Sequence, residues 1–71
     1  SNNRQREVIL QYLMVRQRVR DFDHWMDVFR SHKQAHEAAG LWHPVVMRDA
    51  TDPAMITCIL EVHDPVRAQA F

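Results

Sequence analysis

The stretch from Val19 to Gly40, VRDFDHWMDVFRSHKQAHEAAG, decides the fold because it has the pattern of one amphipathic helix with both ends marked. Its apolar side chains recur every three or four residues, and its charged side chains fall mostly opposite them. Asp21 or Asp23 can cap the first turn, and Gly40, the only glycine in the chain, suits a helix end. The pattern predicts a helix over residues 22–39 with one broad buried face.

Strand patterns lie on both sides of this helix. Over residues 8–15, apolar side chains occur at both odd and even positions, which indicates a strand that is covered on both faces. Residues 45–48 form a second apolar run, after a proline that we expect to prevent regular pairing over residues 41–44. The connector 49–53 has the aspartates and the proline of a tight reversal, so we expect residues 55–63 to complete a hairpin.

The last of these strands alternates with a period of two residues. Its uniformly apolar face, which we expect to pack on helices, consists of Ile56, Cys58, Leu60 and Val62. Its other face carries Glu61 and His63 in a mixed environment. Asp64 and Pro65 then have the pattern of a second helix start, and we expect that the short segment after them is only part of that helix.

Length and charge limit the possible partners. The chain has 71 residues, which we divide into a polar lead-in or cloning remnant over residues 1–7 and one domain over residues 8–71. A chain this short buries only about 60% of its unfolded surface. Because Cys58 has no partner for a disulfide, we expect a homodimer to supply the missing burial. Nine basic and nine acidic residues balance, so we expect no nucleic acid or membrane partner and a cytoplasmic location.

The order strand, helix, strand, strand, helix is five-sixths of a ferredoxin-like βαββαβ unit, an α+β fold with an antiparallel sheet. The run VRDFDHW, followed by Phe29 and His32, then VVMRDATDP over residues 45–53 and LEVHD over residues 60–64, resembles the dimeric α/β-barrel superfamily. Within it, the chain is most similar to small proteins of the antibiotic-biosynthesis monooxygenase type. The resemblance spans residues 12–71 and implies two protomers that join their sheets around a cavity. It also implies that a C-terminal strand of the family is missing from this chain.

Three side chains are the candidates for catalysis. Glu61 and His63 project from one side of the last strand, and Arg48 on the neighbouring strand reaches the same face if the hairpin register permits. A carboxylate, an imidazole and a guanidinium beside an apolar cavity can orient a phenolic or enolic substrate and remove its proton. The alternative is a salt bridge near the sheet end. A partly desolvated Glu61 would have a raised pKa unless Arg48 or His63 compensates it.

Aromatic and imidazole side chains are the candidates for a ligand pocket. They are Tyr12, Trp25, Phe29, His32 and Trp42. Large aromatic side chains at helical spacing are more often core residues than pocket residues, and the tyrosine can donate to a ligand oxygen. We expect Trp42, which follows the helix, at the mouth of a cavity.

Two other sets of side chains have alternative explanations. His32 and His36 are four residues apart, a spacing that can place two imidazoles on one metal ion. No third ligand accompanies them, so we predict no bound metal. Arg16, Arg18 and Arg20 are a solvated strand edge or, alternatively, an anion site.

Three functional hypotheses remain open. The resemblance implies a cofactor-independent, monooxygenase-like reaction on an aromatic or polyketide-type molecule, because a substrate that forms a stabilised carbanion can react with oxygen itself. A non-catalytic ligand-binding or stress-associated dimer would use the same cavity. A cyclase or isomerase would use Glu61 or His63 as a base.

Overall fold

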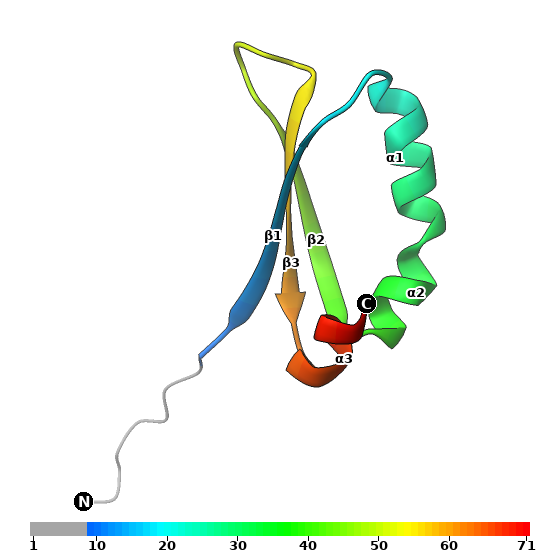
Figure 1. Ribbon diagram of the computed structural model, residues 1–71, viewed down its shortest axis with the longest axis vertical. Coiled ribbons are helices and arrows are strands. Elements are labelled where there is room, and N and C mark those ends of the chain that lie inside the picture. The colour runs from blue at the N-terminus through cyan, green and yellow to red at the C-terminus, as the bar shows by residue number, and fades with distance from the viewer. Residues whose placement is uncertain (1–8) are drawn as a thin grey trace, which may run out of the picture.

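The computed structural model describes residues 9–71, and the predicted lead-in over residues 1–7 lies outside them (Figure 1). The described chain forms, in order, β1 (Gln11–Arg18), α1 (Phe22–Ser31), α2 (Lys33–Ala38), β2 (Leu41–Arg48), β3 (Met55–Val62) and α3 (Pro65–Ala70). This is the predicted α+β class.

The strands form one antiparallel sheet in the order β1-β3-β2. The central strand β3 carries the apolar face that its alternation predicts, and Ile56, Cys58 and Leu60 are almost fully buried. Cys58 pairs with Val15 on one side and with Val46 on the other, so all three strands contribute to that face. The topology is compatible with a ferredoxin-like fragment.

The helices α1 and α2 cover one face of this sheet (Figure 1). Trp25 and Phe29 of α1 pack against a core cluster that contains Leu41, Cys58 and Leu60. In the part of the chain that the structure describes, no helix lies over the opposite face. None of the described helices is long and apolar enough to cross a membrane.

The predicted helix over residues 22–39 is two helices, because the chain turns at His32. The N–H of His32 donates to the carbonyl of Phe29 at 3.1 Å, which is a bond to the third residue back in place of the fourth. Both predicted ends are confirmed. The Asp21 carboxylate accepts from the N–H of His24 at 3.0 Å, and Gly40 has the positive φ of 75° that ends the helical segment.

Two strand boundaries differ from their predictions. β2 begins at Leu41, and its pairing with β3 is irregular only between Trp42 and Val45, so Pro44 interrupts the strand without excluding it. β1 runs over Gln11–Arg18 in place of residues 8–15, because pairing with β3 continues to Met55. The end of β1 is held by an ion pair of 2.8 Å between Arg18 and Asp52.

The β2–β3 connection is the tight reversal that its sequence predicts. The carboxylate of Asp49 accepts from the hydroxyl and the N–H of Thr51, at 2.8 and 3.1 Å, and from the N–H of Asp52 at 2.8 Å. One side chain therefore satisfies the backbone of the turn.

Candidate functional site

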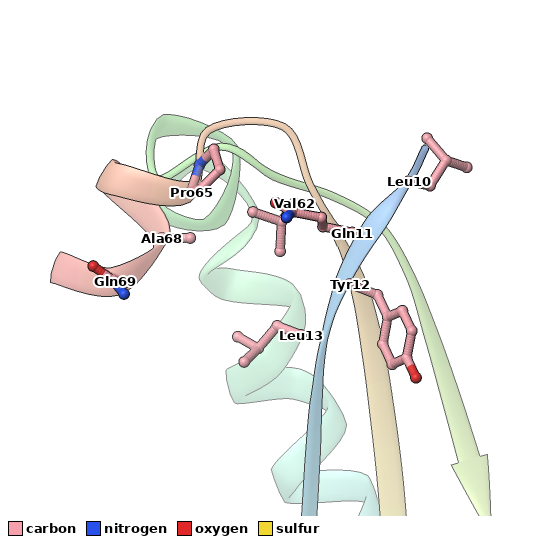
Figure 2. Close-up of a pocket in the computed structure, with 8 residues that line it drawn as sticks. All are labelled: Leu10, Gln11, Tyr12, Leu13, Val62, Pro65, Ala68 and Gln69. Atoms are coloured by element: carbon pink, nitrogen blue, oxygen red, sulfur yellow. The ribbon is translucent and has the colours of Figure 1, made fainter. Parts of the chain in front are cut away.

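The sheet has an open face, the one turned away from α1 and α2. Figure 2 shows Leu13 projecting toward the helices while Tyr12 projects to the other side. By alternation and register, the open face carries Tyr12, Met14 and Arg16 from β1, Thr57, Ile59 and Glu61 from β3, and Val45 and Met47 from β2. Tyr12 is 63% exposed, and Met14 and Val45 are each 53% exposed. The middle of this face is therefore apolar and bare.

At one end of the open face lies a cluster of His43, Glu61 and His63, called here the His–Glu–His cluster. Nδ1 of His43 and Nε2 of His63 each lie 3.0 Å from the same oxygen, Oε1 of Glu61. The indole of Trp42 stacks on the ring of His63 with centroids 5.9 Å apart, and the two imidazoles meet edge to face at 6.0 Å. The cluster thus has an aromatic wall.

The backbone explains why these residues from the start of β2 and the end of β3 meet. The irregularity in β2 leaves His43 with a φ of 52°, which turns its side chain out of the regular alternation. The N–H of His63 donates to the carbonyl of Gly40 at 2.7 Å, which fixes the end of β3 beside the start of β2. A Cβ on Gly40 would lie 2.6 Å from the Cβ of Asp64, so this approach requires glycine.

The electrostatics of the cluster favour an ionised Glu61. Hydrogen bonds from His43 and then from His63 lower the pKa of Glu61 below its usual value, and they outweigh the small effect of desolvation. The compensation that Glu61 needs therefore comes from two imidazoles. When each imidazole donates its N–H to the carboxylate, its other ring nitrogen keeps a lone pair. The arrangement can orient an imidazole as a general base.

The structure does not bring Arg48 to this cluster. Its register partner is Ile56, so Arg48 lies on the face that the helices cover. Its guanidinium carbon lies 4.1 Å from the centroid of the Phe22 ring, and its Nε donates to the carbonyl of Pro53 at 3.1 Å. Of the expected group of three, the structure therefore brings only Glu61 and His63 together. The third residue of the cluster is His43.

The predicted pocket residues divide between the two sides of the sheet. Tyr12 and Trp42 pair with Glu61 from β1 and β2, so they flank the cluster. Trp25, Phe29 and His32 instead line a groove of about 320 Å³ between α1 and the sheet.

The aromatic rings of α1 lie against the core. The rings of Trp25 and Phe29 stack at 5.1 Å, and both side chains are partly buried there. This placement matches the core explanation for these two aromatic residues.

His32 and His36 do lie together, with ring centroids 6.2 Å apart. Phe29 and Phe71 pack on the ring of His36 at 5.1 and 5.2 Å. Burial, and then the nearby His32, lower the pKa of His36. Among residues 9–71, the one group of three potential metal ligands with their donor atoms close together is His43, Glu61 and His63, so the helical pair has no third ligand there.

Two further hollows lie near the ends of the sheet. An open depression of about 440 Å³ runs between β1 and α3 and is lined largely by apolar side chains, with Gln11 and Gln69 as its amides (Figure 2). A smaller pocket of about 150 Å³ lies between α2 and β2, and both Trp42 and His43 line it. Trp42 therefore lines a small pocket beside the end of the helical segment.

His43 is the cluster residue that sequence reasoning missed. The proline after it predicts a break before the strand, although a proline inside an apolar run is also a signal for a bulge, which can redirect a side chain.

Comparisons with protein-family models, with curated proteins and with solved structures find no match to this chain.

Proposed function

We propose that the chain works as a homodimer in which the open faces of two sheets enclose a small aromatic or hydrophobic ligand, and that the His–Glu–His cluster takes a proton from it. The observation that carries the proposal is an exposed apolar sheet face with this cluster at its end. An apolar floor with a few convergent polar groups is typical of small-molecule sites.

A second copy is the cover that this face favours. An apolar sheet face is normally buried against another layer of structure, and bare apolar patches on small proteins usually mark an interaction site. A two-fold axis would place Met14 and Val45 of one copy against the same face of the other. The resemblance to dimeric α/β barrels supports the same arrangement.

The proposed chemistry is proton abstraction. The ionised Glu61 accepts the N–H of His63, which leaves the other nitrogen of that ring as the base. That nitrogen takes a proton from an acidic C–H or phenolic O–H, and the ligand becomes a resonance-stabilised anion. In the monooxygenase-like form, suggested by the family resemblance, this anion transfers one electron to dioxygen without a bound cofactor. The resulting ligand radical and superoxide combine into a peroxide, which takes up the proton from the imidazolium and loses water, so that one oxygen atom stays on the ligand.

One observation also favours an isomerase or cyclase. The cluster holds two imidazoles whose ring centroids are 6.0 Å apart, so one ring can accept a proton while the other returns one at a second position. This reaction consumes no oxygen. It would instead exchange the substrate's acidic hydrogen for deuterium in heavy water.

Oxygen uptake with anthrone and quinol probes tests the catalytic proposal. Since general-base catalysis contributes about 10²- to 10⁴-fold, we expect His63→Gln to lower turnover by at least about 100-fold while the protein still binds the probe. His24→Gln, an exposed histidine of α1, is the matched control and keeps full activity. Binding of the probes without oxygen uptake or exchange would replace catalysis with ligand binding, and failure of all probes to bind would contradict the pocket.

A further inference from the structure

We infer that His43, Glu61 and His63 form a binding site for a divalent transition metal ion of the zinc type. The inference concerns the same side chains as the proposed base, in an alternative state: a His63 that binds the ion carries its proton on the other ring nitrogen and does not act as a base. The metal site needs neither a dimer nor an organic ligand. It departs from the sequence-based prediction that the chain binds no metal, which considered only His32 and His36.

The spacing of the donor atoms fits one ion. The nitrogen atoms of both imidazoles lie 3.0 Å from Oε1 of Glu61, and all three donor atoms lie within 4.8 Å of one another. Zinc binds nitrogen and carboxylate oxygen at about 2.0–2.2 Å, which places neighbouring ligand atoms about 3.3 Å apart in a tetrahedral site. The two imidazole nitrogens lie within 4.8 Å of each other, so they have to approach by up to about 1.5 Å to bind one ion. All three side chains are at least partly exposed, so changes in their side-chain torsions can bring the donor atoms together around the ion.

The donor types also fit. Two imidazoles and one carboxylate suit zinc and its neighbours in the first transition row, whereas calcium and magnesium prefer sets of oxygen ligands. Three protein ligands leave at least one coordination position for water or for a ligand oxygen. Such an open position distinguishes a reactive site from a closed structural one.

The three ligands come from rigid parts of the fold. Glu61 is in the central strand, His63 is tied to Gly40 through a hydrogen bond of 2.7 Å, and the indole of Trp42 stacks on the His63 ring. His43 is set by the irregularity of β2. To bind the ion, each neutral imidazole gives up its hydrogen bond to Glu61 and coordinates the metal with the same nitrogen. This requires only that its proton is on the other ring nitrogen. The ion thus replaces two hydrogen bonds without rebuilding the backbone.

Titration of untagged, chelator-treated protein with zinc chloride and with cobalt chloride tests the inference. We expect one ion per chain by calorimetry and a visible cobalt spectrum typical of nitrogen and oxygen ligands. Loss of a supporting partner outside the ligand set already weakens metal binding by about 10- to 100-fold, so loss of a direct ligand in His43→Ala or His63→Ala should weaken it at least that much. Circular dichroism of each variant verifies that it is folded.

Two matched controls separate this cluster from the other histidines. His24→Ala and His36→Ala remove one imidazole each and should leave the affinity unchanged. Failure of the intact chain to bind zinc at millimolar concentration would overturn the inference, as would affinity that survives His43→Ala but is lost in His36→Ala. Because no organic probe is present, these outcomes are independent of whether the proposed catalysis is found.

Discussion

Replacing Met14 with glutamate should separate the proposed dimer into monomers. Met14 lies in the middle of the open face, pairs with Ile59 of β3 and is 53% exposed in the single chain. Complete burial of a methionine side chain is worth about 1.5–3 kcal/mol, so covering the exposed half contributes about 1 kcal/mol per copy. The two copies of a symmetric dimer together lose about 2 kcal/mol, or roughly 30-fold in affinity. The cost of burying a carboxylate adds to this loss.

Sedimentation equilibrium over a range of protein concentrations measures the effect. We expect the intact chain to have the mass of a dimer and Met14→Glu to have a dissociation constant at least about 30-fold higher. Val66→Glu is the control, because it adds the same charge at an apolar residue of α3 that is already 79% exposed. Equal dimerisation of the intact chain and Met14→Glu would refute the role of the open face, and an intact chain that is a stable monomer at micromolar concentration would refute the dimer.

Two further predictions concern the fold. Gly40→Ala should lower the free energy of unfolding, measured in urea, by more than about 2 kcal/mol. A positive φ of 75° costs about 1–2 kcal/mol for alanine, and the new Cβ would lie 2.6 Å from Asp64. A change below about 0.5 kcal/mol would contradict the close approach. The hydrogen bond from the hydroxyl of Thr51 is the main cause that lowers the pKa of Asp49 in the folded chain. The ionised Asp49 therefore stabilises the fold at a pH above its unfolded pKa of about 3.9, and this stabilisation is lost as the pH falls through its folded pKa. Unfolding of Asp49→Asn should therefore depend less steeply on pH below about 4 than unfolding of the parent chain, and parallel profiles would contradict the role of the turn.

The features that the sequence predicts correctly depend on neighbouring residues only. Asp21 caps α1 because its side chain reaches an N–H three residues ahead, and Gly40 ends the helical segment through its own φ. The alternation of β3 identifies Ile56, Cys58 and Leu60 as the buried face without knowledge of the partner strands. Local chemistry and a period of two residues are sufficient for these conclusions.

The features that the sequence does not predict depend on strand register or on a single backbone hydrogen bond. The face on which Arg48 lies follows from its register with Ile56, and a shift of one residue in that register would have moved it to the side of Glu61. The break at His32 comes from one hydrogen bond that joins residues three apart in a segment whose apolar pattern continues through it. Periodicity carries no information about either event.

The backbone junction at Gly40 connects the stability of the fold with the geometry of the candidate site. Its carbonyl accepts the N–H of His63, its missing side chain admits Asp64, and His43 follows only three residues later. His63 is therefore positioned from this junction, while His43 is turned by the irregularity of β2 and Glu61 is held in the central strand. A displacement of the junction would move the donor atom of His63 away from that of Glu61. The donor atoms of Glu61 and His63 stay next to His43 because the chain can pass close to itself at its single glycine, and the residue that stops the helix thereby also fixes the end of β3.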